Sequence, residues 1–150
     1  MSGEGSRGRD ATGLRFAVTA EPAAADVAAV SQALAAFNEA DVGPAGQRPL
    51  VVLVRDGTGT LVAGITGYTA WGWLYVQRLW VAEGQRGRGV AGRMLQRAED
   101  EARRRGCHGA WIDTFSPVAL GVYQRAGYAP FGALPEFPKG RTRTFLSKRL

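Results

Sequence analysis

A glycine-dense turn between an apolar strand and an amphipathic helix constrains this chain more than any other feature. The strand ends at Val81, the glycines fall within residues 84–92, and an apolar helical stripe continues from Val90. Glycines let backbone amides come close to an anion. The first amides of a helix lack intrahelical acceptors and lie at the positive end of the helix dipole. Residues 79–95 therefore predict a phosphate-binding strand, turn and helix.

The length of 150 residues is typical of one domain. Residues 1–12 hold Gly, Ser and charged residues without apolar periodicity, so we expect a disordered tail and one domain over residues 13–150. The start has no signal-peptide core, and no run of about 18 apolar residues occurs, so we expect a cytoplasmic protein without a membrane partner. The single cysteine, Cys107, excludes an internal disulfide and is expected to be a buried small hydrophobe.

The formal net charge is +6, and only Lys139 and Lys148 among the 19 basic residues are lysines. Such a charge attracts anions of any kind. The run Arg103–Arg105 follows acidic residues four positions earlier and stands before Gly106, which indicates a solvated helix end. Because no aromatic and basic recognition motif accompanies the charge, we expect no nucleic-acid partner.

Apolar periodicity predicts a β-α-β-β-β-α-β-α-β-β order, which places the chain in the α/β (α+β) class with helices packed on a mixed sheet. The expected strands are Leu14–Thr19, Leu50–Arg55, Leu61–Tyr68, Trp73–Val81, Ala110–Thr114, one beginning at Tyr128, and Arg141–Arg149. The expected helices begin at Pro22, Val90 and Ser116–Pro117 and stop before Gly43, Gly106 and Gly127.

The turn admits two interpretations. Residues 87–92 fit the dinucleotide pattern G-x-G-x-x-G, with Asp113 placed as a ribose-binding acid would be. However, five residues separate Val81 from Gly87, whereas the dinucleotide turn follows its strand directly, and only 37 residues follow Asp113. These features disfavour a dinucleotide fold.

The second interpretation is a resemblance to a known family. Arg86-x-x-Gly89-x-Ala91 resembles the Q/R-x-x-G-x-G/A loop of the GNAT (Gcn5-related N-acetyltransferase) superfamily, and residues 119–128 resemble its A-x-x-x-Y-x-x-x-G-F/Y helix ending. The resemblance is to small bacterial members of unassigned substrate. It implies a mixed, mostly antiparallel central sheet with a parallel splayed strand pair, flanked by about four helices.

The resemblance implies acetyl-CoA as cofactor. Its pyrophosphate would lie on the amides of residues 88–92 with Arg86 and Arg88 at the rim, and its pantetheine arm in the splay beside the main chain of Leu79 and Val81. The implied cofactor-binding residues are Leu79, Val81, Arg86, Gly87, Arg88, Gly89, Val90, Ala91, Gly92, Ser116 and Tyr123. No metal site is expected.

Tyr123 matches the family tyrosine that acts as general acid toward the coenzyme A sulfur. Ser116 stands where many members have an asparagine, and its hydroxyl is also suited to cap a helix. Gln77 and Arg78 stand where some members place a glutamate base. The base is therefore left open among Asp113, Glu83, Glu136 and water.

The implied reaction is transfer of an acetyl group to a primary amine of a small molecule, by direct attack. A peptide or protein amine is the nearest alternative, and a non-catalytic acyl-CoA-binding domain is another. A homodimer is left open as an oligomeric state. The aromatic residues that could line an acceptor pocket are Trp71, Trp73, Tyr75 and Phe37.

Overall fold

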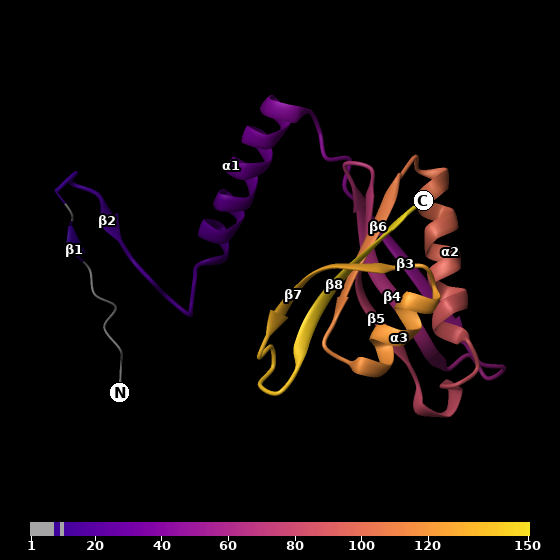
Figure 1. Ribbon diagram of the computed structural model, residues 1–150. Helices are drawn as coiled ribbons and strands as arrows, with labels where there is room; N and C mark the ends of the chain where they lie inside the picture. Colours follow the sequence, from indigo (N-terminus) through magenta and orange to yellow (C-terminus); the bar gives the residue numbers. More distant parts are fainter. Residues whose placement is uncertain (1–7, 10) are drawn as a thin grey trace. The chain divides into compact units, whose positions relative to one another are not determined.

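The computed structural model describes residues 8–9 and 11–150, which divide into two compact units at Pro44. In the first unit, β1 (Gly8–Arg9) pairs antiparallel with β2 (Arg15–Phe16), and helix α1 (Ala24–Val42) follows (Figure 1). The strand predicted from residue 14 to 19 is therefore only two residues long, and the helix begins two residues after Pro22. Residues 1–7 and 10 of the expected tail lie outside the described residues.

The second unit contains the central sheet and follows the predicted order of elements. Its elements are β3 (Arg48–Arg55), β4 (Leu61–Ala70), β5 (Trp73–Val81), the 3-10 helix η1 (Glu83–Gln85), α2 (Val90–Arg104), β6 (Gly109–Thr114), α3 (Pro117–Arg125), β7 (Ala129–Pro135) and β8 (Thr142–Arg149). The strand order is β3-β4-β5-β6-β8-β7. Only β5 and β6 pair in parallel, which confirms the predicted mixed, mostly antiparallel sheet.

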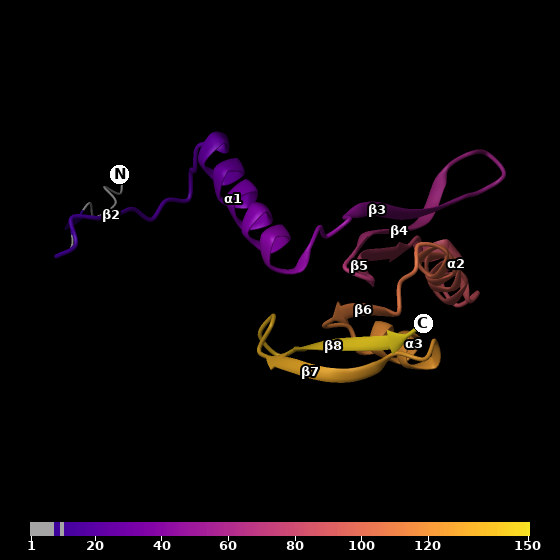
Figure 2. The ribbon, with the colours of Figure 1, turned by 90° about the horizontal axis from the view of Figure 1, so that it is seen from above.

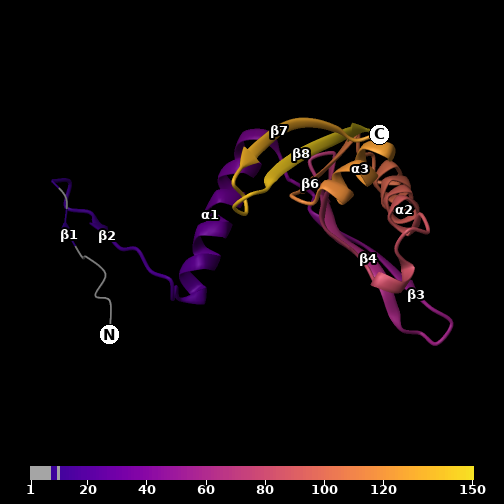
Figure 3. The ribbon, with the colours of Figure 1, turned by 60° about the horizontal axis from the view of Figure 1, so that its bottom comes forward.

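Helices α2 and α3 pack on the same face of this sheet (Figure 3). Leu95 and Ala98 of α2 are fully buried against strand residues such as Ile65 and Leu74. Because side chains alternate along a strand, the neighbours of these core residues point to the other side. We call that side the second face of the sheet; it carries Trp73, Tyr75, Trp111, Asp113, Arg143, Phe145 and Ser147.

The arginines at the end of α2 are paired with acidic side chains, as the sequence predicts for a helix end. Arg104 and Arg105 both form ion pairs with Glu101, and Arg103 forms ion pairs with Asp100 at 3.0 Å and with Glu99 at 3.9 Å. Asp100 thus pairs with the residue three positions later rather than with Arg104, four positions later. No helix among residues 8–9 and 11–150 is long and apolar enough to cross a membrane.

Candidate functional site

Strands β5 and β6 form a ladder over four residues and then separate. Their pairing runs from Trp73 opposite Gly109 to Val76 opposite Ile112 and stops there, which leaves residues 77–81 of β5 without a partner on β6. Figure 2 shows β6, β8 and β7 diverging from β3, β4 and β5. The parallel strand pair is therefore splayed, as the sequence resemblance predicts.

A β-bulge lies at the point where the strands separate. Thr66 pairs with Arg78 and Gly67 pairs with Val76, so Gln77 is an extra residue on β5. A Cβ on Gly67 would lie 2.0 Å from the Tyr75 carbonyl oxygen, a contact that no side chain can make. The bulge bends β5 away from β6, and it requires glycine at position 67.

The main chain of Leu79 and Val81 faces the splay. The Ala82 amide donates to the Val62 carbonyl at 2.8 Å, and bonded and non-bonded pairs alternate in an antiparallel ladder. Leu79 and Val81 occupy the alternate positions, opposite Ile65 and Ala63, so their amide and carbonyl groups point away from β4. A linear ligand in the splay would meet the Leu79 amide and carbonyl and the Val81 amide as it would meet the edge of a strand, whereas the Val81 carbonyl accepts from Arg86.

The turn after β5 is held by its own side chains. The Arg86 Nε donates to the Val81 carbonyl at 3.1 Å, and Arg88 reaches the side chain of Gln85 at 3.4 Å. Gly87 and Gly89 have φ values of 75° and 71°, in the left-handed region that favours glycine. The five-residue spacer noted in the sequence is therefore a 3-10 turn, closed by Arg86, that sets the start of α2.

The N-terminus of α2 has room for an anion. Gly89 is its N-cap, and no side chain caps the helix. A Cβ at Gly84, Gly87, Gly89 or Gly92 would meet no atom within 4 Å. Uncapped amides, open space and two nearby guanidinium groups match the chemistry of a pyrophosphate.

Tyr123 lies buried on α3, close enough to Asp113 to feel its charge. Burial first and the Asp113 carboxylate second raise the pKa of Tyr123 from 10.0 to about 12, so its hydroxyl stays protonated at neutral pH. Asp113 accepts hydrogen bonds from Arg143 at 2.8 Å and from the Tyr75 hydroxyl at 3.3 Å. Asp113 is also the first residue of β6 beyond its ladder with β5.

Ser116 is the N-cap of α3, as its sequence context predicts. Its Oγ accepts from the Ala119 amide at 3.2 Å, and its own amide donates to Thr114 Oγ1 at 3.0 Å. Ser116 also lines a cavity of about 240 Å³ between the start of α3 and β8. A cofactor contact of its hydroxyl remains an expectation.

The three acidic candidates for a base lie in different places. Glu83 is in η1 and exposed, and Glu136 accepts from the Gly140 amide in the β7–β8 loop, whereas Asp113 stands at the splay. Cys107 is buried, and burial raises the pKa of its thiol, which makes it a poor nucleophile. No three His, Cys, Asp or Glu side chains in the described part of the chain form a metal-binding group.

The structure places the four aromatic residues predicted to line an acceptor pocket in different parts of the chain. Trp73 lines a cavity on the second face, and Tyr75 stacks on Trp111 beside it, but Trp71 is in the β4–β5 turn and Phe37 belongs to the first unit. Sequence reasoning missed Arg143, whose guanidinium carbon lies over the rings of Phe115 and Phe137, 5.2 and 4.1 Å from their centroids. The alternation along β8 indicated that Arg143 and Phe145 share a face of the sheet. Only the pairing of β8 with β6 shows that this face also carries Asp113.

The described part of the chain thus combines a splayed parallel strand pair, an uncapped α2 N-terminus and a buried Tyr123 in an α/β fold. Residues 20–128 match the model of the acetyltransferase (GNAT) family, which is most of the chain. The chain belongs to the GNAT family and is an acyltransferase by that membership.

Relatives agree with this assignment. "Acetyltransferase Atu2258" of Agrobacterium fabrum is 44% identical over 121 residues, 81% of this chain and 88% of the relative. "Blasticidin-S acetyltransferase" of Streptomyces morookaense is 40% identical over 124 residues, 80% and 90% of the two chains. A crystal structure of a candidate acetyltransferase from Agrobacterium tumefaciens superimposes with a TM-score of 0.86 at 40% identity, covering 91% of this chain and all of the other.

Proposed function

We propose that this protein transfers an acetyl group from acetyl-CoA to a primary amine of a small molecule. The observation that carries the proposal is the splay, because the Leu79 main chain and the Val81 amide face it, and the chain then continues through one short turn to the uncapped N-terminus of α2. Family membership supports an acyl-CoA donor. The name of the Streptomyces relative, blasticidin-S acetyltransferase, supports a small acceptor rather than a protein.

The proposed binding mode assigns a role to each part of the site. The amides at the start of α2, with Arg86 and Arg88 at the rim, hold the pyrophosphate, and Leu79 and Val81 pair with the pantetheine arm. Acetyl-CoA, when bound, supplies the acetyl group as an activated thioester. Because the Arg86 Nε is engaged by the Val81 carbonyl, only its terminal nitrogens are available to an anion.

Tyr123 acts as the proton donor in the proposed reaction. Its hydroxyl is protonated at neutral pH and can donate toward the sulfur as negative charge develops there; the pKa of about 12 makes it a weak acid, so the transfer depends on that developing charge. Asp113 lies on the acceptor side, where its carboxylate can hold the incoming amine or take its proton through water. The amine must be neutral when it attacks, so this proton has to leave before the new bond forms.

Two measurements test the proposal. A thermal-shift titration with acetyl-CoA should raise the melting temperature, because a ligand that binds only the folded state stabilises it. Thiol release with a panel of small amines and one lysine peptide should then show turnover with small amines. Stabilisation without turnover would indicate a binding domain, and no stabilisation at saturating acetyl-CoA would contradict the cofactor assignment.

A charge-reversed pair of variants tests the pyrophosphate site. Arg88→Glu should raise the KM for acetyl-CoA by about tenfold, because it places a negative charge beside the proposed anion. Arg97→Glu makes the same charge change in a later turn of α2 and should leave this KM unchanged. Equal effects of the two variants would show that only the net charge matters.

A further inference from the structure

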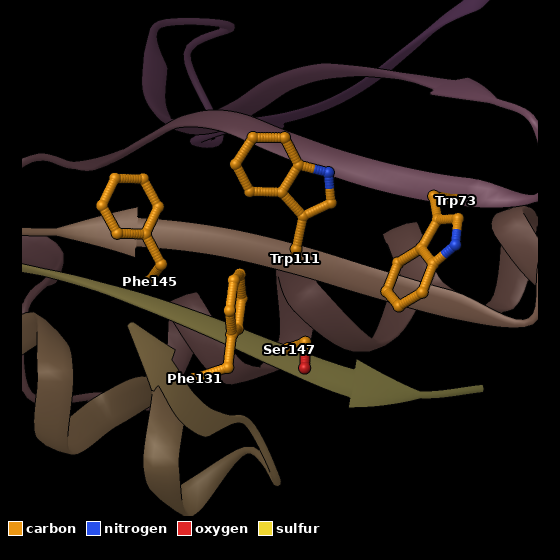
Figure 4. A pocket seen from close by; sticks show the side chains of 5 residues that line it. All are labelled: Trp73, Trp111, Phe131, Phe145 and Ser147. Carbon is orange, nitrogen blue, oxygen red and sulfur yellow. The ribbon is translucent and has the colours of Figure 1, made fainter. Parts of the chain in front are cut away.

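The second face of the sheet holds an aromatic cavity of about 480 Å³. Its lining comes from four strands: Trp73 of β5, Trp111 of β6, Phe145 and Ser147 of β8, and Phe131 of β7 (Figure 4). Cavities of roughly 300–1,000 Å³ with apolar walls are typical small-molecule sites. None of these lining residues belongs to the segment 77–81 of β5 that borders the splay.

Small residues beside Trp111 create the space. Ser147 is the cross-strand partner of Trp111, and Ala129 is the partner of Ser147. On the other side of the indole, the Tyr75 ring stacks at 3.8 Å between centroids and 7° between planes. The stacking contact with Tyr75 therefore fixes the orientation of the Trp111 ring, and the rest of the indole surface lines the cavity.

One residue that lines the cavity is paired with the residue at which β5 and β6 separate. Phe145, which lines it, is the cross-strand partner of Asp113, and directly opposed residues on one face have Cβ atoms roughly 5 Å apart. Asp113 is the first residue of β6 past the ladder with β5. A molecule in the cavity thus has one end next to the proposed site of acetyl transfer.

We propose that this cavity binds the acceptor of the reaction through a planar ring, so that the substrate is a primary amine on a short linker to an aromatic or heteroaromatic group. The inference rests on the function proposed above. Ring stacking on Trp111 favours planar groups over saturated ones of equal size. The lining offers one hydroxyl, on Ser147, and no charged side chain, so an anionic ring is disfavoured.

A matched pair of amines tests the ring preference. With acetyl-CoA present, 2-phenylethylamine should be acetylated with a kcat/KM about three- to tenfold higher than 2-cyclohexylethylamine, which has the same linker and a non-planar ring. Trp111→Leu should bring this ratio close to one. Ser147→Leu should do the same by filling the cavity while leaving the aromatic residues in place. Trp71→Leu, the same change at an exposed tryptophan in the β4–β5 turn and outside the cavity, should keep the ratio.

Calorimetric titration separates the ring site from the reaction. Protein saturated with coenzyme A, which carries no acetyl group, should bind 2-phenylethylamine more tightly than 2-cyclohexylethylamine. Ring-selective binding without any acetylation would contradict the proposed function and support the cavity. Acetylation of both amines at equal rates, or no binding of either, would overturn the ring site. A change in molecular mass in solution for Trp111→Leu and Ser147→Leu would also overturn it, because the cavity would then be an interface between copies.

Discussion

The tyrosine on α3 is both buried in the core and close to a carboxylate, and the sequence alone does not show that one residue has both properties. The motif around Tyr123 predicts a catalytic tyrosine, whereas an amphipathic helix predicts a core tyrosine, and the structure shows burial of 95% of its surface. The nearby Asp113 carboxylate adds to burial in raising the pKa of Tyr123. That effect depends on the pairing of β6 with β8 and on the packing of α3, neither of which the sequence specifies.

Tyr123→Phe should reduce kcat for acetyl transfer by about 10²-fold or more, because it removes the proposed proton donor. The KM for acetyl-CoA should change little. Tyr128→Phe removes another buried hydroxyl from the same region and should retain the parent rate. Equal turnover of Tyr123→Phe and the parent protein across pH would rule out the proton-donor role.

The raised pKa of Tyr123 also predicts a pH dependence of folding stability. Above pH 10 the tyrosine ionises in the unfolded chain but stays protonated in the folded one up to a pKa of about 12. The stability present below pH 10 is therefore lost as pH rises toward 12. Urea unfolding at pH 9 and 11 should show a loss for the parent that exceeds the loss for Tyr123→Phe by about 1.4 kcal/mol. Parallel losses in the two proteins would contradict the shift.

At the element scale, the order of strands and helices was predictable, and the way in which β5 ends was not. Apolar alternation and helical stripes gave nearly all elements of the second unit within a few residues. The bulge at Gln77 depends on the register of β4 against β5, and Gly67 carries no sign of it in the sequence. The first unit differs most from the sequence prediction. The strand expected to begin at Leu14 has only two residues, Arg15 and Phe16, and it pairs with Gly8–Arg9.

Gly67→Ala should destabilise the protein by about 3 kcal/mol or more, because its Cβ would overlap the Tyr75 carbonyl and the backbone of the bulge would have to move. The thermal shift caused by acetyl-CoA should shrink with it. Gly64→Ala is the matched control on the same strand. Its Cβ would lie 3.2 Å from the Val52 carbonyl oxygen, a tight contact but not an overlap, so it should destabilise the protein less than Gly67→Ala. A Gly67→Ala protein with parent stability and affinity would show that the splay does not depend on this glycine.

At the scale of the second unit as a whole, one buried acid links distant parts of the chain. Glu99 of α2 is 2% exposed and forms an ion pair with Lys148 of β8, whose Nζ also donates to the Ala126 carbonyl at 2.8 Å. The sequence assigns Glu99 to a row of exposed helix pairs, because i to i+4 spacing cannot show what packs above a helix. Lys148 therefore joins α2, α3 and β8 around the core.

Lys148→Met should lower the free energy of unfolding by about 3–5 kcal/mol, because it leaves the buried Glu99 carboxylate with Arg103, 3.9 Å away and half exposed, in place of its closer Lys148 partner. Arg104→Met breaks an exposed ion pair on the same helix and should cost less than about 1 kcal/mol. Chemical denaturation of both variants measures the difference. Similar small losses would show that Glu99 finds another partner or takes up a proton.

The splay between β5 and β6 is closed at one end, and this sets a length. Residues 77–81 of β5 measure roughly 16 Å at about 3.3 Å per residue, and the gap ends where Val76 meets Ile112. In the proposed binding mode, a pantetheine arm that enters from the α2 end stops where β5 and β6 pair. The length of the unpaired segment therefore limits how far the acyl group can extend. A donor with a longer acyl chain would have to push its reacting carbonyl back toward the entrance, and chain length would be discriminated by backbone geometry rather than by a side-chain pocket.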